Sequence, residues 1–159
     1  MELLDFAGRQ KYGNMQWLGG WLEEQVRHGR LEEEAAGCIR QADILEFLQC
    51  NSGKRMQEAA RKQKLYREQP FVLGVDAKEL YPEEEDGELI LIQGIIDAYF
   101  EEPDGLVVLD YKTDKVNNGK ELAEKYQEQL RYYAKALEQM SGKKVKEKII
   151  YSFTLKKEI

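Results

Sequence analysis

The chain has 159 residues, of which 42% are hydrophobic and 34% are charged, and its formal net charge is −6. This length and composition indicate one soluble domain with a substantial core and exclude a disordered protein. Apolar runs fall short of the roughly 20 residues that span a bilayer, and no signal peptide precedes the first predicted helix, so we expect a cytoplasmic protein without a membrane partner.

The sequence contains two cysteines, Cys38 and Cys50. Two thiols without C-x-x-C spacing are too few for a structural zinc or an iron–sulfur cluster. We therefore expect no iron–sulfur cluster and two reduced, buried thiols. The sequence also lacks the G-x-x-x-x-G-K-[S/T] loop of nucleotide-driven motors.

Residues 1–64 are predicted to form three or four helices. Apolar residues recur there at helical spacing in two clusters: Trp17, Leu18, Trp21 and Leu22, and then Ile44, Phe47 and Leu48. We expect a break at Gly19-Gly20 and a further helix at 54–64, capped by Ser52.

Charge is distributed unevenly along the chain. Residues 83–88 hold five acids in an expected exposed turn. Cations gather instead around the last N-terminal helix: Lys54, Arg55, Arg61, Lys62, Lys64 and Arg67. Such a run is typical of a solvated helix face, and it also attracts the phosphates of DNA. Because the net charge is negative, we expect the free domain to hold DNA weakly.

From residue 65 onward the pattern changes to strands. We expect strands at 65–75, 88–100 and 105–113, a helix at 119–140 and a last strand at 147–155. The second and third strands are rich in β-branched, aliphatic and aromatic residues, and Pro103-Asp104-Gly105 between them favours a turn. These two strands are therefore predicted to form a hairpin.

Two aspartates and a lysine interrupt the apolar hairpin. Asp97 lies in its first strand, and Asp110 and Lys112 lie near the end of its second. Because side chains alternate along a strand, Asp110 and Lys112 share a face, and Asp97 can come alongside. Two carboxylates there are costly to bury unless they hold a cation such as Mg²⁺ or Mn²⁺, beside which Lys112 would position a water or offset charge on a phosphate. The alternative is an ordinary ion pair at the end of the sheet.

The helix predicted at 119–140 carries a polar residue on its apolar face. Asn118, with Glu121 three residues later, suits its N-terminal cap, and Gly142 suits its C-terminal end. One stripe recurs at spacings of three and four and should face the sheet: Leu122, Tyr126, Gln129, Leu130, Tyr133 and Leu137. Taken alone, Gln129 in this stripe is also consistent with a satisfied amide in a tyrosine-rich core.

Three motifs, G-I-I-D, D-Y-K-T-D and Y-x-x-Q-x-x-x-Y, follow one another at 94–97, 110–114 and 126–133. In this order they resemble the RecB-like branch of the PD-(D/E)XK nucleases, and most closely the C-terminal nuclease domains of AddA proteins from AddAB helicase-nucleases. The resemblance implies an α/β, restriction-endonuclease-like core of αβββαβ order, with a mixed sheet flanked by helices. In that fold 1–64 is the N-terminal helical part of a single domain, and 65–159 is the nuclease core.

The resemblance also implies a set of site residues. Asp97 and Asp110 match metal ligands, the backbone carbonyl of Tyr111 completes the metal's shell, and Lys112 matches the catalytic lysine. Glu68 matches an upstream acidic position that adds a ligand, although the residue by itself is equally typical of a solvated glutamate. Contacts to the substrate are expected from the third motif: Gln129, Tyr133 and Tyr126.

One residue of the family pattern is missing from its usual place. The family carries a histidine on a helix, followed closely by V-M-x-x-L-D-F. The opening M-E-L-L-D-F at 1–6 resembles the segment just after that histidine, so we expect a fragment that begins downstream of one active-site residue. The only histidine, His28, lies far from that position and beside a predicted helix end, which favours a surface role.

The resemblance implies a Mg²⁺- or Mn²⁺-dependent DNA exonuclease domain of an AddAB-type ATP-dependent helicase-nuclease, acting in double-strand break repair and recombination. Its expected partners are DNA, an AddB-like partner subunit, and the remainder of the helicase subunit. The alternatives are a stand-alone RecB-like nuclease and a non-catalytic DNA-binding or docking module that keeps the fold. Intact Asp97, Asp110 and Lys112 weigh against the non-catalytic module.

Overall fold

The computed structural model describes residues 1, 3–8, 15–81, 83 and 88–159. Four helices lead the chain: α1 (Met15–Arg27), α2 (Glu33–Cys38), α3 (Gln41–Gln49) and α4 (Asn51–Arg61). The core then runs β1 (Leu65–Asp76), α5 (Ala77–Leu80), β2 (Leu89–Glu102), β3 (Gly105–Lys112), α6 (Gly119–Ser141), β4 (Val145–Ser152) and β5 (Lys157–Glu158). The short elements α5 and β5 were not predicted from the sequence.

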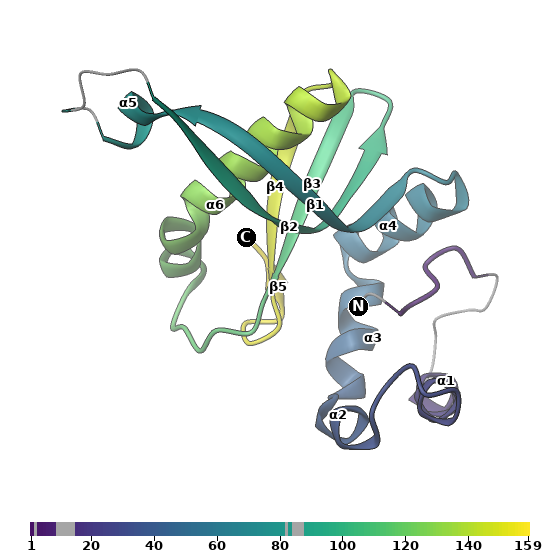
Figure 1. Ribbon diagram of the computed structural model, residues 1–159. Helices are drawn as coiled ribbons and strands as arrows, with labels where there is room; N and C mark the ends of the chain where they lie inside the picture. The colour runs from purple at the N-terminus through teal and green to yellow at the C-terminus, as the bar shows by residue number, and fades with distance from the viewer. Residues whose placement is uncertain (2, 9–14, 82, 84–87) are drawn as a thin grey trace.

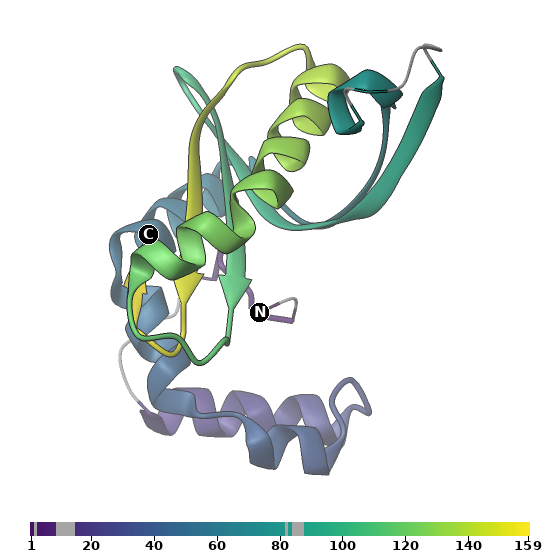
Figure 2. The ribbon, with the colours of Figure 1, turned by 90° about the vertical axis from the view of Figure 1, so that its left-hand side faces the viewer.

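The five strands form one mixed sheet in the order β1-β2-β3-β4-β5. Neighbouring strands are antiparallel except β3 and β4, which are parallel because α6 returns the chain to the starting end of the sheet. α6 covers one face of the sheet, while the N-terminal helices lie on the other side (Figures 1 and 2). The predicted mixed sheet flanked by helices is therefore confirmed.

Alternate residues of β3 divide between two hydrophobic cores. Val107 and Leu109 pack toward the N-terminal helices, whereas Leu106 and Val108 pack toward α6. All four side chains are at most 2% exposed, so β3 is the buried centre of the sheet. A polar residue placed next along β3 inherits this burial, which sets the conditions at the site.

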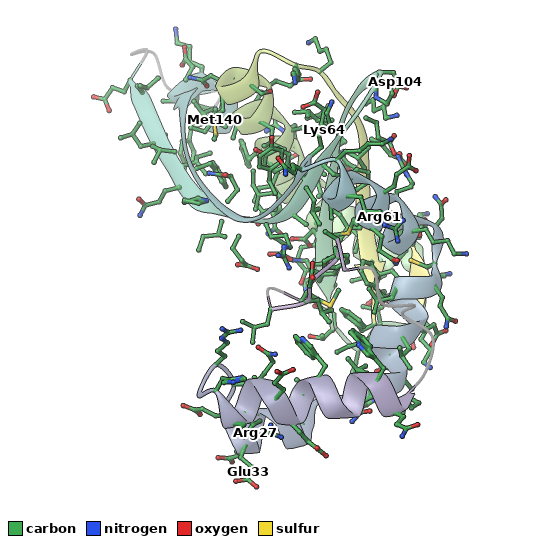
Figure 3. The ribbon with its side chains drawn as sticks, turned by 90° about the vertical axis from the view of Figure 1, so that its right-hand side faces the viewer. Arg27, Glu33, Arg61, Lys64, Asp104 and Met140 are labelled. Atoms are coloured by element: carbon green, nitrogen blue, oxygen red, sulfur yellow. The ribbon has the colours of Figure 1, made fainter. Side chains whose placement is uncertain are left out.

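The β2–β3 hairpin turns at Pro103-Asp104, as predicted, and Asp104 lies at its tip (Figure 3). Gly105 has a φ of 149°, and a Cβ at this position would lie 2.8 Å from the carbonyl oxygen of Lys144. Glycine is therefore required where the turn enters β3.

The caps predicted for α6 are confirmed. The side chain of Asn118 accepts a hydrogen bond from the N–H of Glu121 at 3.0 Å, and Gly142 ends the helix with a φ of 68°. The buried side of the helix is formed by Leu122, Leu130, Tyr133, Ala136 and Leu137. Tyr126 and Gln129, the other members of the predicted stripe, are half-buried at its margin.

β1 and β2 continue beyond the rest of the sheet as a two-stranded arm that carries α5 at its end (Figure 1). Phe71, Leu73 and Val75 on the inner side of the arm belong to the core under α6. Residues 84–87 of the expected acidic turn lie outside the described residues.

Two predictions for the N-terminal helices were wrong. Gly19 and Gly20 lie inside α1, because the apolar face of α1 remains buried through Leu18 and Leu22 on either side of them. The N-cap of α4 is Cys50, whose sulfur accepts from the N–H of Gly53, whereas Ser52 lies in the first turn. Packing against neighbouring elements outweighs the weak helix propensity of glycine here.

The predicted burial of the thiols holds only in part. Cys38 is exposed and Cys50 is half-buried. His28 follows the last residue of α1 and is exposed, in agreement with the prediction. None of the helices in the described part of the chain combines the length and apolarity needed to cross a membrane.

Several cations of the predicted basic stretch already have acidic partners. Ion pairs join Arg55 to Glu102, Lys62 to Glu58, and Lys64 to Glu101. These carboxylates compete with phosphates for the same cations, so the stretch is a weaker electrostatic surface than its sequence indicates.

Arg55 ties α4 to the sheet. Its guanidinium lies 2.8 Å from Glu102 at the end of β2 and 2.6 Å from Glu147 on β4. Hydrogen bonds from Arg55 are the main cause that lowers the pKa of Glu102 to about 2. A charge pair that is only about one-fifth exposed is worth more than an ordinary surface pair.

We expect Gly53→Ala to destabilise the protein by about 2–3 kcal/mol through overpacking. A Cβ at Gly53 would lie 2.1 Å from the carbonyl oxygen of Phe47, which is backbone and cannot move aside. The matched control is Gly20→Ala in α1, where a Cβ meets nothing within 4 Å. Because alanine is the better helix former, the control should gain about 0.5–1 kcal/mol. Urea unfolding of both variants measures this, and equal effects would contradict the packing described.

We expect the Arg55–Glu102 pair to make stability depend on acid pH. Because the folded pKa of Glu102 lies below its ordinary value of 4.5, its contribution is present above that value and is lost as the pH falls toward about 2. The difference in unfolding free energy between wild type and Glu102→Gln should therefore be on the order of 2 kcal/mol near neutral pH and shrink across this window. A difference independent of pH would refute this.

Candidate active site

Three acidic residues occupy matching positions on three neighbouring strands. The β2–β3 ladder ends at the pair Ala98–Leu109, and its register continued by one residue places Asp97 opposite Asp110. The β1–β2 ladder keeps one register on both sides of Glu68, which places Glu68 opposite Asp97. The point where β2 parts from β3, called the fork here, therefore collects carboxylates from β1, β2 and β3.

The carboxylate of Asp110 is buried beneath α6. Asp110 is 1% exposed and follows Val108, a member of the core under α6, by two residues along β3. Among the described residues, neither carboxylate oxygen has a partner with hydrogen-bond geometry. Burial raises the pKa of the Asp110 carboxyl, and the neighbouring lysine offsets only part of that rise. A buried carboxylate in this condition is costly to the folded protein.

Asp97 closes the fork with its side chain. Its Oδ2 accepts a hydrogen bond of 2.9 Å from the backbone N–H of Tyr111. This bond continues the connection between β2 and β3 beyond the last ladder pair. It also fixes one oxygen of Asp97 beside the strand that carries Asp110.

The ammonium group of Lys112 is surrounded by three different groups. Its Nζ lies 2.7 Å from Oδ2 of Asp110 and donates to Oε1 of Gln129 at 3.1 Å. The same nitrogen lies 4.0 Å from the centroid of the Tyr126 ring. The side chain of Lys112 is 13% exposed, so its charge is held at the edge of the buried carboxylate rather than in free solvent.

Gln129 joins the lysine to Tyr133. Its Nε2 donates to the hydroxyl of Tyr133 at 2.5 Å, while its Oε1 accepts from Lys112. Tyr133 is buried, and its ring packs edge-on against Phe71 of the arm. Burial raises the pKa of Tyr133, and Asp110, among other nearby carboxylates, adds to the rise. The polar members of the predicted stripe thus face the carboxylates at the fork.

Glu68 differs from its strand neighbours in its backbone. It is exposed and has a φ of 47°, within the left-handed region that non-glycine residues rarely adopt. This conformation costs on the order of 1–2 kcal/mol in a side-chain-bearing residue. The strain lies directly opposite Asp97 in the strand register.

The side chain of Tyr111 points away from the fork. Its ring lies in the core under the N-terminal helices, edge-on to Phe47, and its hydroxyl is 3.6 Å from the sulfur of Met56. Burial strongly raises the pKa of this phenol. Only the backbone of Tyr111 can therefore take part in chemistry at the fork.

Asp114 makes contacts that were not predicted from the sequence. Both of its carboxylate oxygens accept from the hydroxyl of Tyr126, at 2.9 and 3.0 Å, and it pairs with Lys125 at 2.5 Å. Hydrogen bonds from Lys125 and then Tyr126 lower the pKa of Asp114. Its place two residues after Lys112 was visible in the sequence, but the path of the following loop back to α6 was not.

The donor set at the fork suits a hard divalent cation. Asp110 offers carboxylate oxygens without hydrogen-bond partners, and Asp97 lies on the neighbouring strand with one oxygen engaged by a backbone N–H. Within the described ranges, no three His, Cys, Asp or Glu side chains lie close enough to form a complete cluster. The two aspartates therefore fit a metal that takes its further oxygens from backbone, water or substrate.

The sequence matches the PD-(D/E)XK nuclease superfamily over residues 7–158. A relative from Lachnoclostridium phytofermentans, an ATP-dependent helicase/nuclease subunit of the AddA type, is 38% identical over all of this chain and 14% of its own length. Proteins of the same name from Acetivibrio thermocellus and Clostridium botulinum are 45% and 39% identical, over 83% and 100% of this chain and 11% and 13% of theirs.

The chain thus spans 11–14% of the length of these relatives. The match to the superfamily takes in the fork, the lysine beside it and the polar face of α6. The motif-based resemblance is confirmed, and the mixed sheet with its flanking helices agrees with a restriction-endonuclease-like fold. The chain belongs to the PD-(D/E)XK nuclease superfamily.

Proposed function

We propose that this chain is a Mg²⁺- or Mn²⁺-dependent DNA exonuclease domain that hydrolyses phosphodiester bonds at the fork. The observation that carries the proposal is the buried carboxylate of Asp110, which has no hydrogen-bond partner among the described residues and lies beside Lys112. A protein retains so costly an arrangement when a ligand offsets it.

In this proposal Asp97 and Asp110 hold the cation, and the backbone carbonyl of Tyr111 adds a third oxygen. Glu68 is a further ligand, supported by its register opposite Asp97 and by its strained backbone. When bound, the cation supplies a Lewis acid that activates water and offsets charge on the phosphate.

Lys112 is proposed as the catalytic lysine. Its ammonium group is anchored on Asp110 and Gln129, which fixes a positive charge at the edge of the fork. A pre-positioned donor of this kind stabilises the charge that develops on a phosphate oxygen as the bond to water forms. The charge needs no rearrangement of its own, because it is held in place before substrate binds.

Gln129 and Tyr133 are proposed to contact the substrate. They lie on α6 along the margin of the fork, and their hydrogen bond to one another orients both side chains. Tyr126 was expected to share this role, but its hydroxyl is already bound to Asp114.

The relatives indicate a larger context for the domain. Because their names describe subunits of ATP-dependent helicase/nucleases, we propose that this domain works with a helicase portion and an AddB-like partner subunit on DNA, in double-strand break repair and recombination. Residues 1–64 and 65–159 then form its helical part and its nuclease core. With several of its own cations already paired, the domain would receive DNA from the motor rather than capture it unaided.

We expect Mn²⁺ or Mg²⁺ to raise the unfolding temperature of the chain, because a ligand bound only by the folded state stabilises it. The gain is about 2.7 kcal/mol when the free cation is at about 100 times its Kd. Asp110→Asn should abolish the shift, whereas the matched change Asp104→Asn at the exposed hairpin tip should keep it. Equal shifts in wild type and Asp110→Asn would contradict the assignment of the metal site.

We expect Lys112→Ala to lower the rate of DNA cleavage on the order of 10²-fold, because about 2.7 kcal/mol of transition-state stabilisation is lost. The metal-dependent shift in unfolding temperature should largely remain. A gel assay on linear single-stranded DNA measures the rate, with Lys62→Ala, a surface ion-pair lysine next to α4, as the control. Wild-type cleavage by Lys112→Ala would reduce Lys112 to a structural partner of Asp110 and favour the non-catalytic module.

A further inference from the structure

The position of Lys112 depends on a ring that has no charge of its own. An ammonium group has three N–H donors. Two acceptors, Asp110 Oδ2 and Gln129 Oε1, are atoms at fixed points, and the third neighbour is the face of Tyr126, 4.0 Å away at its centroid. An aromatic face attracts a cation only where the ring presents itself to the charge. The orientation of the Tyr126 ring is therefore part of the geometry around Lys112.

Asp114 fixes that orientation. The phenol of Tyr126 donates to both carboxylate oxygens of Asp114, at 2.9 and 3.0 Å, so the far end of the ring is anchored. Asp114 follows Lys112 by two residues in the loop that leaves β3, whereas Tyr126 lies on α6. The loop leaving the lysine's own strand thus holds the helix residue against which the lysine rests. Hydrogen bonding to an anion also polarises the phenol and makes its face more attractive to a cation.

We propose that Asp114 is a positioning residue for nuclease chemistry: by holding the phenol of Tyr126, it fixes the ring that supports the Lys112 ammonium. The inference rests on the proposed role of Lys112. It assigns Tyr126 to support of the lysine in place of contact with substrate. It also gives a role to the last residue of the D-Y-K-T-D motif, for which the sequence predicted none.

A purely structural role for Asp114 makes a different prediction. Asp114 also pairs with Lys125 at 2.5 Å, and that ion pair alone would tie the loop to α6. Lys125→Ala removes this tie and leaves both hydrogen bonds from Tyr126 possible. Asp114→Asn keeps an oxygen that accepts from Tyr126 but loses the charge. These two variants separate positioning of the ring from anchoring of the loop.

The kinetic test uses linear single-stranded DNA with Mg²⁺. Asp114→Ala and Tyr126→Leu should each lower kcat about 10-fold, equivalent to about 1.4 kcal/mol, with KM within about two-fold of wild type. Asp114→Asn should recover most of the loss, and Lys125→Ala should remain within about two-fold of wild type. The proposal is overturned if Lys125→Ala reproduces the loss seen with Asp114→Ala, or if Asp114→Ala raises KM and leaves kcat unchanged.

A second test needs no activity. In EDTA, the ε-methylene protons of Lys112, identified by their loss in Lys112→Arg, should resonate upfield because they lie over an aromatic face. The upfield shift should disappear in Tyr126→Leu, fall by roughly half or more in Asp114→Ala, and persist in Lys125→Ala, as expected for a cation held on a fixed ring. A wild-type shift in Asp114→Ala would overturn the proposal. Full cleavage by Lys112→Ala would instead overturn the proposed function and leave this result intact.

Discussion

The buried carboxylate of Asp110 is the constraint on which the rest of the site depends. It lies at the fork between β2 and β3, is 1% exposed, and finds no hydrogen-bond partner among the described residues. Such a group is tolerated only beside a compensating charge. Lys112 supplies that charge at 2.7 Å, and the lysine in turn needs Gln129 and Tyr126 of α6. The placement of α6 over the sheet is therefore tied to the electrostatics of one aspartate.

The scaffold supplies stability that the fork does not. Two cores on either side of β3 bury its apolar residues, and the caps of α6 satisfy both ends of the helix above the site. On the opposite side of the sheet, Arg55 ties the N-terminal helices to the strands through Glu102 and Glu147. The strained backbone of Glu68 and the buried charge of Asp110 are costs that this framework carries at the point where ligand chemistry is proposed.

Sequence alone was sufficient where the structure is set by local rules. Asn118 and Gly142 cap α6 as their residue types indicate, and strand alternation alone places Asp110 and Lys112 on one face. It failed where tertiary packing decides the outcome. Gly19-Gly20 lies inside α1 because its neighbours are buried, and the hydrogen bonds from Tyr126 to Asp114 depend on a loop whose path no periodicity encodes. The left-handed backbone of Glu68 is likewise invisible in a sequence that reads as a continuous strand.

The central claim is that a divalent cation binds between Asp97 and Asp110. Anomalous diffraction from crystals of the chain soaked in Mn²⁺ tests it most directly, because the ion itself is located. The account predicts a manganese peak at the fork, about 2.2 Å from carboxylate oxygens of both aspartates, a distance typical of hard cations on oxygen ligands. Manganese found only elsewhere, for example on the exposed acids at Asp104 or Glu88, with none at the fork, would contradict it.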